Sequence, residues 1–143
     1  MFLRYNVLLN RITQKQIKQI AERVRGVGGR VLFEGGAVRD EIMGINPKDF
    51  DLEVYGIEAN TLESILCEFG SVNTVGKQFG ILKLGGLDVS IPRRDSKTSP
   101  GHGGFIVEGD PYMTIEEAAR RRDLTINSIA KDPLTGEIFD PFN

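Results

Sequence analysis

Cysteine and histidine are almost absent from this 143-residue chain, and it has no long hydrophobic run. One cysteine, Cys67, excludes an internal disulfide and a zinc site built from cysteines. Cys67 lies in an apolar helical run, so we expect a buried core thiol. The single histidine, His102, excludes a metal site with several imidazole ligands. With no membrane-length apolar run and no signal peptide at the start, we expect a cytoplasmic protein.

The composition is that of an ordinary globular chain, with 40% hydrophobic and 27% charged residues. A length of 143 residues predicts one domain with a substantial core. The formal net charge is −2, so the chain as a whole does not attract nucleic acid. Any RNA contact must come from a local basic patch.

Hydrophobic periodicity and turn residues predict helices before and between short strands. Thr13 and Gln16 form a capping-box start, with Ile17, Ile20 and Val24 following at helical spacing. We expect helices from Thr13 to the glycines after residue 25, and over 37–43, 61–69 and 114–130. We expect strands over 31–34, 49–55, 72–75, 79–84, 87–91 and 137–139, a hairpin at Gly85-Gly86, and a long loop over 92–104. This order favours a small mixed sheet with helices on one side.

Acidic and apolar residues alternate along 49–55, which places Asp49, Asp51 and Glu53 on one face of a strand. Asp88 lies in a second alternating run, and pairing of the two strands would bring it to the same cluster. Three carboxylates together are costly unless a cation neutralises them. Oxygen ligands suit Mg²⁺, so the pattern favours a two-metal phosphoryl-transfer centre.

A solvated acidic face on an edge strand is the alternative, and it would be preferred for an isolated Asp-x-Asp. The metal site is favoured here because the run follows Gly35-Gly36 and the start of a helix. Backbone N–H groups at such a start attract phosphate, and Arg39 lies one turn further on. A plain turn with Arg39 in a surface pair with Asp40 remains the alternative.

A second group of candidates lies in the run RRRDLTIN at residues 120–127. Asp123 and Asn127 are spaced i, i+4 and share a helix face between apolar neighbours, which favours an orienting role. A solvated helix with salt bridges is the alternative for the three arginines. The basic loop 93–98 could contact triphosphate or RNA, or could simply be solvated. His102 lies among glycines and is predicted to be neither ligand nor base.

With these motifs in view, the chain resembles the catalytic head domain of class II (bacterial-type) tRNA nucleotidyltransferases, the CCA-adding enzymes, and the related poly(A) polymerases. The matching stretches, in order, are GGAVRDEIMGINPKDFDLEVYG (35–56), FGILKLGGLDVSIPRRDSKTSPGHGGF (79–105) and RRDLTINSIAKDPLTGEIFDPFN (121–143). The resemblance implies an α+β architecture, the DNA polymerase β-like nucleotidyltransferase fold, with a small mixed or antiparallel sheet flanked by helices.

The resemblance also implies roles for the acidic residues. Asp49 and Asp51 would be the Mg²⁺ ligands and, with Asp88, the catalytic carboxylates. The family often has Glu at the position of Asp88, so the shorter side chain is a departure.

Nucleotide contacts follow from the same resemblance. Gly35, Gly36 and Arg39 would hold the triphosphate of the incoming nucleotide. Arg122 would contact the nucleotide, and Asp123 and Asn127 would shape the region of the sugar and the primer end; these three complete the implied nucleotide site.

The implied reaction is attack of an RNA 3′-hydroxyl on the α-phosphate of ATP or CTP, with Asp88 receiving the hydroxyl proton directly or through water. The partners would be ATP, CTP and the tRNA 3′ end, with no DNA. A-only, CC-only or poly(A) addition, a non-catalytic nucleotide-binding relative, and a minimal transferase acting on a small molecule or protein are the alternatives.

Full-length members of this family carry neck, body and tail regions after the head. We expect residues 1–143 to be the head alone, either excised or naturally short, and weakly active by itself. The oligomeric state stays open, and a homodimer through an apolar face exposed near the end of the chain is one arrangement.

Overall fold

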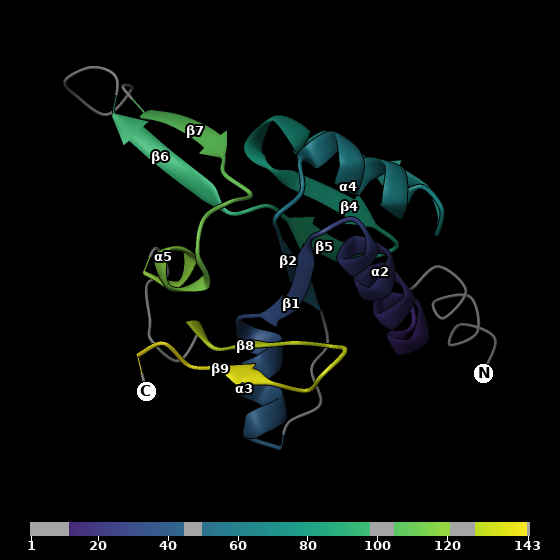
Figure 1. The fold of residues 1–143 in the computed structure, drawn as a ribbon, viewed down its shortest axis with the longest axis vertical. Coiled ribbons are helices and arrows are strands. Elements are labelled where there is room, and N and C mark those ends of the chain that lie inside the picture. The colour runs from purple at the N-terminus through teal and green to yellow at the C-terminus, as the bar shows by residue number, and fades with distance from the viewer. Residues whose placement is uncertain (1–11, 45–49, 98–104, 121–127, 143) are drawn as a thin grey trace.

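The computed structural model describes residues 12–44, 50–97, 105–120 and 128–142 (Figure 1). Within this part, seven strands form one mixed sheet in the order β3-β4-β5-β2-β1-β8-β9. Its strands are β1 (Arg30–Glu34), β2 (Asp51–Tyr55), β3 (Val72–Asn73), β4 (Ile81–Leu84), β5 (Leu87–Ser90), β8 (Ala130–Lys131) and β9 (Ile138–Phe139). A separate two-stranded ribbon pairs β6 (Arg93–Lys97) with β7 (Phe105–Gly109). The helices are α2 (Gln14–Gly26), α3 (Gly36–Ile42), α4 (Ala59–Leu66), α5 (Ile115–Ala119) and the 3₁₀ turn η1 (Lys77–Phe79).

Helix α2 begins where the sequence predicts. The Thr13 hydroxyl accepts a hydrogen bond from the Gln16 N–H, and the Gln16 side chain accepts one from the Thr13 N–H. This reciprocal pair satisfies two N–H groups that the first helical turn leaves without partners. The predicted apolar stripe is buried against the sheet, with Ile20 and Val24 fully inaccessible.

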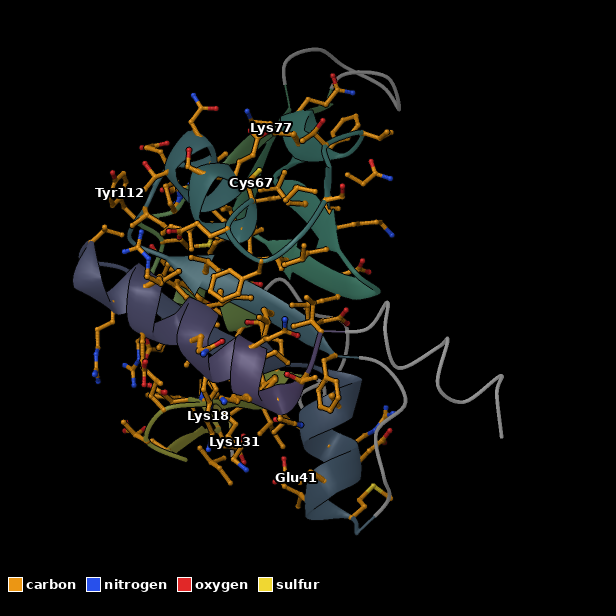
Figure 2. All side chains as sticks on the ribbon, turned by 90° about the vertical axis from the view of Figure 1, so that its right-hand side faces the viewer. Lys18, Glu41, Cys67, Lys77, Tyr112 and Lys131 are labelled. Atoms are coloured by element: carbon orange, nitrogen blue, oxygen red, sulfur yellow. The ribbon has the colours of Figure 1, made fainter. Side chains whose placement is uncertain are left out.

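Helices α2 and α4 lie next to each other on one side of the sheet in both views (Figures 1 and 2). Because strand residues alternate between faces, every second residue of β1, β2, β4 and β5 points to this side, and these residues are apolar. We call it the helix-covered face, and its core includes Val31, Phe33, Leu52, Val54, Leu62, Leu66, Leu82 and Val89. The opposite side, the acidic face, carries Glu34, Asp51, Glu53 and Asp88.

The hairpin predicted at Gly85-Gly86 is confirmed. The φ angles of the two glycines are 52° and 82°, the left-handed values that a tight two-residue hairpin turn requires and that other residues rarely adopt. Leu84 and Leu87 face each other directly across the turn. The hairpin delivers β5 to the edge of β2, where the two strands pair in parallel.

The predicted loop over 92–104 is wrong for residues 93–97. They form β6, paired with β7 from Arg93 opposite Gly109 to Lys97 opposite Phe105, while residues 98–104 lie outside the described part. The run Arg-Arg-Asp-Ser-Lys lacks the apolar alternation that predicts a strand with one buried face. In Figure 1 this ribbon extends away from the main sheet, so its strands need no such pattern.

The helix expected over 114–130 has its predicted start but not its predicted end. Thr114 and Glu117 form the capping box, and the bond from the Thr114 N–H holds the pKa of Glu117 below its usual value. Helix α5 ends at Ala119, and Ala130 belongs to β8, opposite Glu34 of β1. Ala130 is fully buried, and its backbone pairs with a strand that is about 100 residues away in the sequence. Local hydrophobic periodicity does not report such a distant pairing.

Helix α5 also corrects the expectation that all helices lie on one side. Its Ala118 packs with Met113, Leu32 and Tyr55 in a second, smaller core on the acidic face.

Helix α4 is shorter than the predicted 61–69, and Cys67 follows it as an exposed residue, so the prediction of a buried thiol is wrong (Figure 2). None of the helices in the described ranges combines the length and the hydrophobicity that crossing a membrane requires.

Candidate active site

The acidic face carries one straight row of charged residues across four neighbouring strands. Asp51 is the register partner of Glu34 on one side and of Asp88 on the other, and Asp88 is in turn the partner of Lys83. Register partners point to the same face of a sheet and lie one strand spacing apart, about 4.8 Å. We call Glu34, Asp51, Asp88 and Lys83 the acidic row.

The two candidate catalytic carboxylates that the structure describes, Asp51 and Asp88, open into the same cavity. It has a volume of about 330 Å³ and lies between the sheet, the start of β6 and α5. Asp51 is exposed and Asp88 is half-buried, so solvent and ligands reach both. The lining residues are Asp51, Glu53, Ile81, Asp88, Ser90, Ile91, Pro92, Arg93 and Ala118.

Another cavity, of about 400 Å³, lies on the helix-covered side beside α3. Apolar side chains, among them Phe33, Val38 and Phe50, line it together with Gln14, Glu41 and Lys131. Its one carboxylate, Glu41, is paired with Lys131 at 2.5 Å (Figure 2). The cavity on the acidic face is therefore the better candidate for phosphate chemistry.

The sequence predicts Asp49 as the partner of Asp51, and this residue lies outside the described part. Among residues that the structure does describe, no three acidic, histidine or cysteine side chains converge as a metal site. The pair Asp51 and Asp88 offers oxygen atoms on neighbouring strands in one open cavity, which fits a hard divalent cation. Lys83 Nζ lies 3.3 Å from Asp88 Oδ1, so the cavity also has a positive charge at its β4 side.

Gly35 and Gly36 lie at the end of β1, directly after the acidic row. Gly35 has φ 66° and ψ −135°, a conformation open essentially only to glycine, and it starts α3. A Cβ built on Gly36 would lie 3.2 Å from Arg39 Nη2, so the guanidinium group folds back over this turn. The pair of Arg39 with Asp40, weighed as the alternative, is also present at 3.1 Å.

Three buried side chains at this end of the acidic row, Glu34, Glu53 and Tyr55, form a hydrogen-bonded cluster. None of them is among the predicted site residues. The Tyr55 hydroxyl donates to Glu53 Oε1 at 2.7 Å and lies 3.3 Å from Glu34 Oε1. All three side chains are less than a tenth exposed. The alternation along 49–55 placed Glu53 on the acidic face, but it does not report that Ala118 of α5 lines the same cavity as Glu53.

We expect Tyr55→Phe to lower the free energy of unfolding by about 1–3 kcal/mol, because a buried carboxylate loses a hydrogen-bond donor. Urea denaturation followed by circular dichroism measures the change. Tyr112→Phe is the matched control. The Tyr112 side chain is 68% exposed, and the bond from its hydroxyl to Glu58 raises the pKa of Tyr112. Equal effects of the two substitutions would contradict the structural role of Tyr55.

The remaining predicted residues divide into two groups. Arg122, Asp123 and Asn127 lie outside the described residues, as does His102. In the basic segment after β5, Arg93 lines the cavity. Its neighbour Arg94 is instead paired with Asp110 at 3.0 Å.

Comparison with known sequences decides the family. The model of the family described as "Poly A polymerase head domain" matches residues 31–143. The chain belongs to this family. The matched range includes the acidic row, the glycine turn and α5, so the residues of the candidate site all belong to one known type of domain.

Two curated relatives show the extent of the similarity. The Multifunctional CCA protein of Xanthomonas oryzae pv. oryzae is 38% identical over 116 residues, which is 80% of this chain and 27% of that protein. The protein of the same name from Janthinobacterium sp. is 40% identical over 110 residues, which is 76% of this chain and 25% of that protein. The chain thus spans about a quarter of the length of these curated relatives.

Solved structures of similar proteins have the same fold. The Bacillus stearothermophilus CCA-adding enzyme in complex with CTP superposes with a TM-score of 0.66 at 28% identity, covering 87% of this chain and 28% of that one. A tRNA nucleotidyltransferase complexed with a primer tRNA and an incoming ATP analog gives a TM-score of 0.63 at 26% identity, covering 87% and 34%. The predicted α+β nucleotidyltransferase fold, with a mixed sheet flanked by helices, is confirmed.

Proposed function

We propose that this head domain is the catalytic part of a tRNA nucleotidyltransferase that transfers CMP and AMP from CTP and ATP to the 3′ end of tRNA. The observation that carries the proposal is the pairing of Asp51 with Asp88 in one cavity, next to the Gly35 turn. The relatives' names support the CCA-adding reaction, and a solved relative contains CTP.

We further propose that the metal is Mg²⁺, held by Asp51 and, from the sequence pattern, by Asp49. Asp88 would complete the carboxylate set. The donor set supports this assignment because it consists of carboxylate oxygens. When bound, the ion stabilises the negative charge that develops on the transferring phosphate.

The chain's own residues would perform the remaining steps. Arg39, folded over the glycine turn, would hold the triphosphate by a charge-assisted contact. The 3′-hydroxyl oxygen forms a bond to the α-phosphorus while the bond from this phosphorus to the pyrophosphate oxygen breaks. Asp88 would take the hydroxyl proton, directly or through water. Arg122, Asp123 and Asn127 stay predicted nucleotide contacts.

The test is calorimetric titration of the chain with ATP and CTP in parallel, with Mg²⁺ and with EDTA. We expect Mg²⁺-dependent binding of both nucleotides with similar affinity, because the described site contains no group that reads the base. We also expect slow extension of an RNA 3′ end without choice between C and A. Failure to bind either nucleotide would overturn the proposal, and accurate CCA addition would contradict the predicted weak, unselective activity.

Poly(A), A-only or CC-only addition is the second candidate, since the family description itself names poly A polymerase. Extension of tRNA transcripts that end before the first C or before the A, compared with a generic RNA, separates these activities. The relatives' names favour CCA addition. A cytoplasmic location and a homodimer remain predictions.

A further inference from the structure

Lys83 is the one cation of the acidic row, and the proposed reaction gives it no role. It lies on β4 as the register partner of Asp88, with 58% of its side chain exposed. Other lysine ion pairs in the described part, Lys77 with Glu63 and Lys131 with Glu41, involve carboxylates outside the cavity. Lys83 is thus paired with a proposed catalytic carboxylate while its amino group remains accessible.

The strand order separates Lys83 from the proposed triphosphate site. The pair β2–β5 carries Asp51 and Asp88, and β1 and β4 flank this pair on opposite sides. The glycine turn and Arg39 follow β1, whereas Lys83 is on β4. Three strand spacings place β1 and β4 roughly 14 Å apart. One side of the carboxylates therefore holds Arg39 and the other holds Lys83.

An in-line displacement places the attacking and leaving oxygens on opposite sides of the phosphorus. If pyrophosphate leaves toward Arg39, the attacking hydroxyl comes from the β4 side. We propose that Lys83 binds the RNA primer, with its ammonium group contacting a backbone phosphate near the 3′ end. This inference rests on the proposed function and adds a primer-positioning residue to it.

The ion pair suggests how the contact forms. Exposed pairs of this kind are weak, so the ammonium group can exchange one partner for another at little cost. In the structure the partner of Lys83 is Asp88, at 3.3 Å. When RNA arrives, a backbone phosphate takes the place of the Asp88 carboxylate as the partner of the ammonium group.

The test separates RNA binding from nucleotide binding in the full 143-residue chain. A fluorescent RNA oligonucleotide with a free 3′-hydroxyl is titrated by anisotropy, and ATP and CTP are titrated by calorimetry with Mg²⁺. For Lys83→Ala we expect the Kd for RNA to rise about five- to tenfold. The slope of log K against log salt should fall by about 0.7, the loss of one phosphate contact on a single strand. The Kd for ATP and CTP should change less than twofold.

Two variants serve as controls. Lys83→Arg keeps the charge and should retain RNA affinity, whereas Lys131→Ala removes a lysine on the helix-covered side and should leave it unchanged. The inference is overturned if a wild-type chain that binds nucleotide binds no RNA, if Lys83→Ala keeps wild-type RNA affinity, or if it weakens nucleotide binding as much as RNA binding. Failure of the proposed function would appear instead in the wild type, as absence of ATP and CTP binding.

Discussion

Asp51→Asn should abolish measurable nucleotidyl transfer while leaving the fold intact. The substitution keeps the size of the side chain but removes the charge that, under the proposed function, would bind the cation. A cation contributes several kcal/mol to stabilising the transition state, so its loss lowers the rate roughly a thousandfold or more. Mg²⁺-dependent binding of ATP and CTP should disappear in the same calorimetric titration. The rate is measured as single-turnover extension of a labelled RNA at saturating protein.

Glu63→Gln is the control for this experiment. It also removes one carboxylate charge, but Glu63 lies on α4, over the helix-covered face, where it pairs with Lys77. We expect its extension rate to match the wild type. If Asp51→Asn kept more than a tenth of the wild-type rate while its urea unfolding curve stayed unchanged, Asp51 would not be a metal ligand.

Among substitutions that add a single methyl group to the site, Gly35→Ala should cause the largest loss of stability and of nucleotide affinity. At φ 66° and ψ −135° an L-residue is strained, and we expect an alanine there to cost about 1–3 kcal/mol. A Cβ at this position meets no atom within 4 Å, so the cost arises from the backbone and not from a clash. The turn relieves the strain by moving, which displaces Arg39 and the start of α3. Nucleotide affinity should therefore fall at least tenfold, as measured by calorimetry.

Gly36→Ala is the matched comparison one residue later. Gly36 is the first residue of α3 and does not have a positive φ, so alanine fits its backbone. Its Cβ would only push against the flexible end of Arg39, at 3.2 Å. We expect a loss of stability under 1 kcal/mol, in line with the good helix propensity of alanine. Equal destabilisation by both substitutions would show that backbone strain at Gly35 is not the cause.

Several elements of the fold could be predicted from local sequence patterns, because interactions within a few residues determine these elements. The capping box at Thr13 and the glycine pair at 85–86 each specify a structure within a few residues, and both are confirmed. The alternation along 49–55 predicted the faces of Asp51 and Glu53 correctly, and the expected approach of Asp88 is confirmed as a register pair. These residues belong to the candidate site that the sequence predicts.

The sequence predictions are wrong where contacts between residues far apart in the chain determine the structure. Ala130 is helical by local propensity, yet it pairs with β1. The burial of Glu53 and its bond from Tyr55 require neighbours from other elements, so the alternating pattern alone could not identify that cluster. The same holds for Lys83, which local sequence presents as an ordinary exposed lysine in a hairpin. Its partner Asp88 becomes a site residue only through the pairing of β5 with β2.

The parallel pairing of β2 with β5 also has a consequence for how the protein folds. Parallel neighbours cannot be joined by a tight turn, and here α4, β3 and β4 come between them in the chain. The β4–β5 hairpin can form early and alone, but the cavity exists only after this hairpin docks onto β2. Pairing of strands that are far apart in the chain is slow, because the entropy of closing the intervening loop is lost before the new contacts form. Nucleotide binding should therefore be among the last properties regained during refolding, and the nascent chain carries no active centre until β5 has been synthesised and docked.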